Sequence, residues 1–263
     1  MNKKVGLVLL MFVLFVASVV GGKLHWNKKV ANATEQAISE TVLNSKSGKG
    51  GKKAASFNEA YASNLPEAVQ EKLKSAVSEK RALNLALVGD ESSAEKGTWT
   101  ESFTKNLHEA YGEGIWNVTV KSYVGEDTES FTTNERAKEI ADAKPDVIVF
   151  QAPFVTDNKK IGNGNSIANA KTFVEAMAAS AKDAVIMIQP SNPVYNARNY
   201  PKAIASLESF AQQDGYTYVN HWSAWPDPAS EEILPYLQEE FGFPSEKGYA
   251  AWAQYMTDYF VAK

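Results

Sequence analysis

From residue 83 onward, apolar residues follow two alternating patterns along the chain. Short and nearly continuous apolar runs are typical of strands buried on both faces, and between them apolar residues recur every three or four positions, as in helices. The predicted strands are 83–88, 118–124, 146–151, 184–189 and 216–219. The predicted helices are 98–111, 134–143, 166–181, 198–213 and 246–261. This order predicts an α/β fold, a three-layer sandwich with a five-stranded parallel sheet covered by helices on both faces.

The N-terminal residues follow a different pattern. Lys3 and Lys4 precede an uncharged apolar run over residues 5–22, which as a helix would span roughly 27 Å, close to the thickness of a bilayer core. The run is long for a signal peptide, and no A-x-A cleavage site follows it. We therefore expect residues 1–22 to be a single-pass membrane anchor, with a cleaved signal peptide as the alternative. Lysines flank the run on both sides, but its length and the downstream residues favour an extracytoplasmic domain.

Residues 23–80 differ in composition from both neighbouring regions. The stretch "NSKSGKGGKK" at 44–53 is a Gly/Ser/Lys linker, which either lies near anionic lipid headgroups or is a solvated spacer. Residues 65–80 have the pattern of an amphipathic helix with Ala68, Leu73 and Val77 on one face. We therefore expect 23–80 to be a helical tether and 81–263 to be the folded domain.

The composition narrows the classes of function. The net charge is −4, with no dominant basic stripe in the C-terminal part, so we expect no nucleic-acid partner. The chain has no cysteine and only three histidines, which are scattered, so we expect no metal site and no cofactor.

Polar and aromatic residues gather after the predicted strands. In parallel sheets, ligands bind outside the carboxyl ends of the strands, so this edge is the predicted site. The candidate ligand-binding residues are Asp90, Glu91, Asn192, Tyr195, Trp222 and Trp225. Aromatic rings beside amides suit a carbohydrate, whose apolar face stacks on a ring while its hydroxyls pair with polar groups. The alternative is that several of these rings pack the sheet against its helices.

Five segments in order resemble the SGNH/GDSL hydrolases, and most of all the membrane-tethered versions from Gram-positive bacteria. They are "GDES" after the first strand, "KPDVIVFQAPFVTDN", "IMIQPSNPVYNARNYP", "YVNHWSAWPD" and "FPSEKGYAAWAQYM". The resemblance spans residues 83–263 and implies an SGNH/flavodoxin-like fold. It also implies a serine nucleophile after Gly-Asp, a glycine and an asparagine as oxyanion donors, and a histidine base near the C-terminus.

The sequence departs from this pattern at the nucleophile. Glu91 occupies the position where the resemblance implies serine, and Ser92 comes one residue later. Ser92 and Ser93 are therefore the candidate nucleophiles, and the alternative for both is a role in capping the turn or the following helix.

The oxyanion and base positions are only partly filled. Gly125 follows the second strand, and Asn158 follows the third, so these two residues are the candidate oxyanion donors. In the segment where the resemblance places the base, Phe243 precedes the proline and Tyr249 follows the glycine. His221, after the last strand, is the remaining candidate base, with a purely structural histidine as the alternative.

Two functions from different classes follow. The first is a tethered esterase or O-deacetylase acting on an acyl ester of cell-envelope glycan. The second is a catalytically inactive module, a pseudoenzyme that binds cell-surface carbohydrate or serves as a scaffold. The distance between the candidate nucleophile and His221 discriminates between them, because acyl transfer requires a hydroxyl within hydrogen-bond reach of a base.

Overall fold

The computed structural model describes residues 57–161, 163–239 and 242–263. The predicted membrane anchor and the Gly/Ser/Lys linker lie outside these residues. Among the helices of the described part, none is both long and apolar enough to cross a bilayer.

Five parallel strands form one sheet, which confirms the predicted fold class. They are β1 (Leu83–Gly89), β2 (Trp116–Ser122), β3 (Val147–Gln151), β4 (Val185–Gln189) and β5 (Thr217–Tyr218). Their order across the sheet is β2-β1-β3-β4-β5. In register, Gly89 pairs with Ser122 and Gln151 pairs with Gln189, so the carboxyl ends of the strands meet at one edge.

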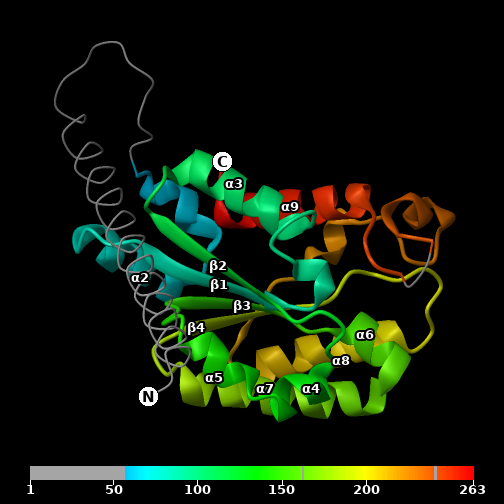
Figure 1. Ribbon diagram of the computed structural model, residues 1–263. Helices are drawn as coiled ribbons and strands as arrows, with labels where there is room; N and C mark the ends of the chain where they lie inside the picture. Colours follow the sequence, from blue (N-terminus) through cyan, green and yellow to red (C-terminus); the bar gives the residue numbers. More distant parts are fainter. Residues whose placement is uncertain (1–56, 162, 240–241) are drawn as a thin grey trace, which may run out of the picture.

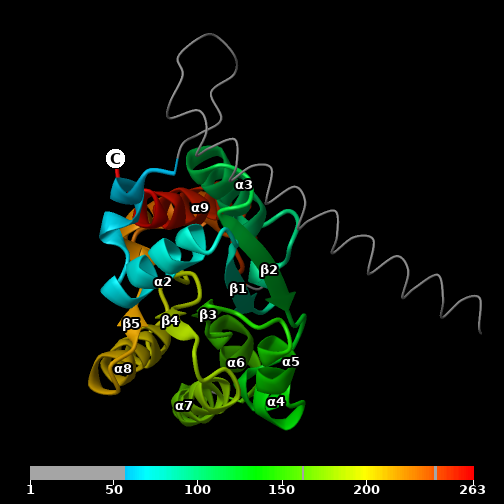
Figure 2. The ribbon, with the colours of Figure 1, turned by 90° about the vertical axis from the view of Figure 1, so that its left-hand side faces the viewer.

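Helices cover both faces of the sheet (Figures 1 and 2). One layer holds α2 (Glu67–Ser78), α3 (Trp99–Tyr111) and α9 (Glu246–Phe260). The other holds α4 (Thr128–Thr133), α5 (Arg136–Ala141), α6 (Phe154–Lys160), α7 (Asn163–Ser180) and α8 (Tyr200–Gln213). The pattern predicted α5 within 134–143 but did not predict α4 or α6, whose six and seven residues show little of a repeating apolar face.

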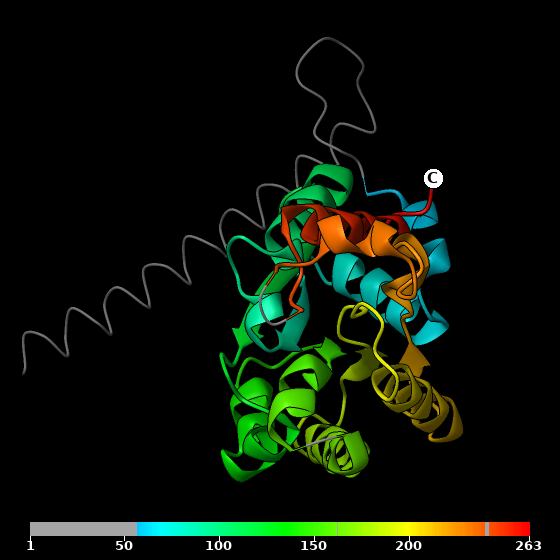
Figure 3. The same ribbon diagram turned by 90° about the vertical axis from the view of Figure 1, so that its right-hand side faces the viewer.

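Four short 3₁₀ helices complete the described part of the chain. They are η1 (Glu59–Asn64), η2 (Glu91–Ser93), η3 (His221–Ala224) and η4 (Glu231–Tyr236). Of these, η2 directly follows β1. Figure 3 shows η3 and η4, in orange, beside α9, which they contact.

Alternate residues of each strand enter opposite cores. Leu85 and Leu87 point into the layer of α2, α3 and α9, whereas Ala86 and Val88 point into the layer of α4–α8. All four side chains are buried. A strand buried on both faces needs apolar residues at successive positions, and this is why the sequence of β1 is a nearly continuous apolar run.

The helix α2 belongs to the folded domain and is not a tether. Its buried residues Val69, Leu73 and Ala76 join the same core cluster as β1 and α9. Ala68, which we predicted to lie on the apolar face, is exposed. The domain therefore begins before the predicted boundary at residue 81. The composition of 23–80 hid this because only one narrow face of α2 is apolar.

The packing of α2 predicts that Leu73→Ala lowers the free energy of unfolding by about 2–5 kcal/mol, since the substitution leaves a cavity in the core. The matched control Glu71→Ala, on the exposed face of α2, should change it by less than about 0.5 kcal/mol. Urea denaturation of the two variants measures the difference. Equal stabilities would mean that α2 does not contribute to the folded core.

Candidate functional site

The end of β1 lies tightly against the end of β3. A Cβ atom on residue 89 would overlap the side-chain oxygen of Gln151 and lie 2.8 Å from Ser93 Oγ, so only glycine fits at Gly89. The backbone N–H of Asp90 then donates to Gln151 Oε1 at 3.2 Å. Gln151 is fully buried. The close approach of these two strand ends fixes the direction in which the chain leaves the sheet.

Asp90 holds the turn that follows. Its carboxylate accepts hydrogen bonds from the Ser92 backbone N–H at 3.0 Å and from Ser92 Oγ at 2.5 Å. Thr156 Oγ1 donates to the other carboxylate oxygen at 3.4 Å. Asp90 is fully buried, and burial raises its pKa to about 6 even though the bonds from Ser92 favour the charged form. Ser92 is thus part of a capped turn, with its hydroxyl bonded to a carboxylate.

Ser93 is held just as firmly. Its hydroxyl donates to Gln151 Oε1 at 3.0 Å and accepts a hydrogen bond from the indole N–H of Trp99 at 3.1 Å. Ser92 and Ser93 are 1% and 0% exposed. Both candidate nucleophiles therefore point into the protein, and this is the turn-capping arrangement that the sequence allowed as the alternative.

Glu91 is the residue of η2 that reaches the predicted oxyanion site. The backbone N–H of Gly125 donates to Glu91 Oε2 at 3.0 Å. Gly125 has a φ of +71°, a conformation that glycine adopts at little cost, and Lys160 Nζ donates to its carbonyl oxygen. The Gly125 N–H, which the resemblance assigns to a substrate oxyanion, is thus already hydrogen-bonded to a carboxylate oxygen of the protein itself.

Tyr249 lies near the two acidic residues, from the first turn of α9. It is half-buried, and its pKa is raised to about 12 by burial and then by the negative charges of Asp90 and Glu91. The resemblance places a histidine base in this segment. A phenol that holds its proton up to such a high pH does not act as a base near neutral pH.

Asn158, the second predicted oxyanion donor, is exposed on α6. Its neighbour Asp157 points inward and accepts hydrogen bonds from the backbone N–H and the hydroxyl of Thr128, each at 2.8 Å. The helical turn of α6 therefore directs the aspartate toward α4 and leaves the asparagine at the surface.

His221 is buried, and both of its ring nitrogens are occupied. Nε2 lies 3.0 Å from the carbonyl oxygen of Pro190, and Nδ1 accepts a hydrogen bond from the indole N–H of Trp225 at 3.0 Å. These partners require the neutral tautomer with the proton on Nε2. The ring also stacks on Trp252, with centroids 4.0 Å apart. Burial lowers the pKa of His221 to about 3.

The structure therefore separates the candidate base from the candidate nucleophiles. His221 forms its hydrogen bonds with Pro190 and Trp225, whereas Ser92 and Ser93 form theirs with Asp90, Gln151 and Trp99. His221 has neither a free lone pair nor a hydrogen bond to a serine hydroxyl, so its geometry is not that of a general base.

The predicted ligand-binding residues after β4 and β5 divide into two groups. Trp225 and Asn192 are buried, and the Asn192 amide donates to the carbonyl oxygens of Pro193 and Gly242. Trp222 and Tyr195 are half-buried, although Trp222 also donates to the carbonyl oxygen of Ser191 and stacks on Tyr200. Trp225 and Asn192 therefore hold the edge together, and Tyr195 and Trp222 are left as its accessible aromatic residues.

Two buried glutamines at matching positions are central to this edge. Gln151 ends β3 and receives hydrogen bonds from Asp90 and Ser93, whereas Gln189 ends β4 and receives one from Trp252. The pattern along the chain did not point to Gln151. The signal that could have found it is a glutamine closing each of two apolar strands, because an amide inside a core needs polar partners there.

The contacts of His221 predict that its ring stays neutral between pH 8 and about pH 4.5. The double variant His25→Gln/His108→Gln leaves it as the only histidine, so its ring signals can be followed by NMR without ambiguity. We expect the shifts of the neutral Nε2–H tautomer throughout this range. A titration with a midpoint near 6.5 would show that the ring is solvated and available as a base.

The burial of Asp90 predicts a stability that depends on pH. Because its pKa is about 6 in the folded protein and 3.8 ordinarily, the folded state binds the proton more tightly than the unfolded state. The contribution of Asp90 is thus greatest at low pH and is lost as the pH rises through 6. From pH 4 to pH 7, the stability of Asp90→Asn relative to the wild type should rise by on the order of 2 kcal/mol. Urea unfolding of both proteins measures this, and a difference that does not change with pH would contradict the burial.

Comparisons with known proteins support the fold. No protein-family model matches the sequence, and no curated protein does. Among solved structures, a GDSL-like lipase from Bacteroides thetaiotaomicron is similar, with a TM-score of 0.52 and 14% identity over 72% of this chain and 96% of the lipase. An acetylxylan esterase from Geobacillus stearothermophilus is also similar, with a TM-score of 0.55 and 13% identity over 68% of this chain and 94% of the esterase. The chain therefore has the fold of the SGNH/GDSL hydrolases, as the sequence motifs predicted.

Proposed function

We propose that this protein is a membrane-tethered, extracytoplasmic module of SGNH fold that binds cell-envelope carbohydrate and does not hydrolyse esters through a serine and a histidine. The observation that carries the proposal is the contact between Glu91 and Gly125. The Glu91 carboxylate accepts a hydrogen bond from the Gly125 N–H, which an acyl-transfer enzyme of this fold would offer to the substrate. A substrate oxygen that develops negative charge would have to displace it.

The remaining groups of the site support the same conclusion. Acyl transfer needs an accessible hydroxyl, a base beside it and donors that converge on the developing oxyanion. Ser92 and Ser93 are buried and bonded inside the protein. His221 is neutral and both of its ring nitrogens already have hydrogen-bond partners, and Tyr249 is a weak acid that keeps its proton.

Three observations favour carbohydrate as the ligand and the membrane as the location. One solved structure of the same fold is an acetylxylan esterase, a protein that acts on a polysaccharide. Tyr195 and Trp222 are half-buried aromatic residues at the ligand-binding edge, and a sugar ring stacks on such side chains. The apolar run at 5–22, with its flanking lysines, is the basis for proposing an anchor.

A second candidate function is an esterase that uses Ser92 with Asp90. The observation in its favour is the 2.5 Å hydrogen bond between Ser92 Oγ and a carboxylate with a pKa of about 6. Such a carboxylate could accept the serine proton near neutral pH. The turn would first have to open, because both groups are buried.

We expect the full-length protein in detergent to show no turnover of p-nitrophenyl acetate above the buffer rate and no labelling by a fluorophosphonate probe, because neither serine reaches solvent. Ser92→Ala and Ser93→Ala should behave like the wild type, and so should the control Ser209→Ala on the exposed face of α8. Turnover and labelling that disappear only in Ser92→Ala would establish the esterase. The binding arm of the proposal is tested by isothermal titration with xylohexaose, cellohexaose and chitohexaose, and failure to bind any neutral glycan would reject it.

A further inference from the structure

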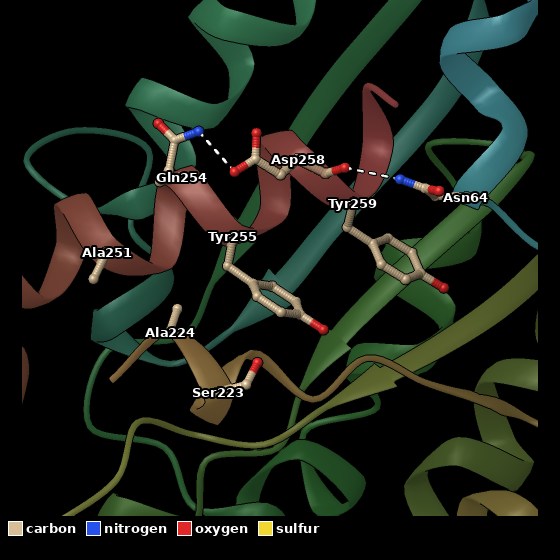
Figure 4. Close-up of a pocket in the computed structure, with 8 residues that line it drawn as sticks. All are labelled: Asn64, Ser223, Ala224, Ala251, Gln254, Tyr255, Asp258 and Tyr259. Atoms are coloured by element: carbon tan, nitrogen blue, oxygen red, sulfur yellow. Dashed lines mark hydrogen bonds between the residues drawn. The ribbon is translucent and has the colours of Figure 1, made fainter. Parts of the chain in front are cut away.

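A groove opens on the outer side of α9, beside the candidate site but lined by other residues. Its volume is about 510 Å³, within the range of small-molecule sites. The lining residues that matter here are Asn64, Ser223, Gln254, Tyr255, Asp258 and Tyr259. They come from η1, η3 and α9, three segments that are far apart in the sequence and meet only in the fold (Figure 4).

Two tyrosines form the aromatic wall of this groove. Tyr255 and Tyr259 are one helical turn apart, and their rings are stacked with centroids 6.4 Å apart and planes 13° apart. In Figure 4 both side chains extend from the same side of α9. Both are half-buried, and their hydroxyls form no hydrogen bond with the described residues. Flat rings with free hydroxyls at their outer ends offer both stacking and hydrogen bonding to a ligand.

The polar groups of the groove are neutral or already paired. The Asp258 carboxylate accepts a hydrogen bond from Gln254 Nε2 at 2.9 Å and forms an ion pair with Lys263 at 3.2 Å. Asn64 Nδ2 donates to the Asp258 carbonyl oxygen at 3.0 Å. The side-chain oxygens of Asn64 and Gln254 remain as acceptors. None of the eight lining residues is a lysine or an arginine, and the adjoining Lys263 is paired with Asp258, so the lining offers a phosphate or a carboxylate no unpaired cation.

We propose that this groove, here called the α9 groove, is a binding subsite for a neutral oligosaccharide. The apolar face of one sugar ring stacks on Tyr255 and Tyr259, and its hydroxyls pair with the amides of Asn64 and Gln254 and with Ser223. This inference rests on the proposed carbohydrate-binding function and adds a subsite on α9, beside the edge of the sheet that holds Tyr195 and Trp222.

The α9 groove is also connected to the buried part of the site. Tyr255 packs edge-on against His221, with centroids 6.5 Å apart, and His221 stacks on Trp252. A sugar on Tyr255 therefore lies one side chain away from a pair of stacked rings that includes an indole. Ligand binding should change the tryptophan fluorescence, which measures binding independently of isothermal titration calorimetry.

The test uses the full-length protein in detergent and the three neutral hexasaccharides named above. We expect Tyr255→Ala and Tyr259→Ala each to weaken binding by about five- to tenfold, because each removes one stacking ring. Tyr255→Phe and Tyr259→Phe keep the rings and should bind within about threefold of the wild type. The matched control Tyr216→Ala removes another half-buried tyrosine, which packs on Phe210 in the core of the other helical layer, and should bind like the wild type.

The outcomes separate this inference from the proposed function. Wild-type affinity in both alanine variants, with binding lost instead in Tyr195→Ala or Trp222→Ala, would overturn the α9 groove and keep carbohydrate binding at the edge of the sheet. No binding of any hexasaccharide by the wild type would overturn both. A fold defect in an alanine variant would lower its melting temperature, which is measured alongside binding. The phenylalanine variants keep the packing of the rings and so separate the effect of the ring from that of the hydroxyl. If they too bind about fivefold or more weakly, stacking is not the source of affinity and the inference fails.

Discussion

The site depends on a single carboxylate that is buried where β1 ends. Taking an ionisable group out of water costs free energy, which hydrogen bonds from its surroundings must offset. Asp90 obtains these bonds from the backbone and the hydroxyl of Ser92 and from Thr156. In the turn that forms them, Glu91 points toward Gly125 while Ser93 points toward Gln151. The turn that satisfies Asp90 thus also holds Glu91, Ser92 and Ser93 in place.

A chain of polar and aromatic contacts makes the other half of the edge equally rigid. His221 is hydrogen-bonded to the Pro190 carbonyl oxygen and accepts a hydrogen bond from the Trp225 indole. Trp252 stacks on His221 and donates to the side-chain oxygen of Gln189. These contacts tie the end of β4 to η3 and to α9. A histidine that holds three elements together in this way serves to position them, and its neutrality is part of that role because a charged ring would be a donor at both nitrogens.

The fold and the chemistry of this protein therefore point in different directions. The sheet, its strand order and its two helical layers are those of ester hydrolases, but fold alone does not determine function. What remains at the edge is an acidic pair beside a glycine N–H, together with aromatic side chains. Neutral ligands that stack and form hydrogen bonds suit such a surface better than ligands that carry negative charge, because Asp90 and Glu91 already contribute negative charge near Gly125.

The fold class follows from the pattern of apolar positions alone, because strands buried on both faces must be apolar throughout and the helices between them must have one apolar side. The sequence also shows that Glu91 stands where the resemblance places the nucleophile and that the segment expected to supply the base contains Tyr249. That α2 is part of the core became evident only in the folded chain, since its apolar face joins a cluster that also holds residues of α9, close to the other end of the sequence. The tertiary structure alone decided that Ser92, Ser93 and His221 face inward, because the direction of a side chain in a tight turn depends on which partner satisfies its neighbour. The α9 groove was likewise invisible in the sequence, because Asn64, Ser223 and Tyr255 become neighbours only when the sheet brings three distant segments together.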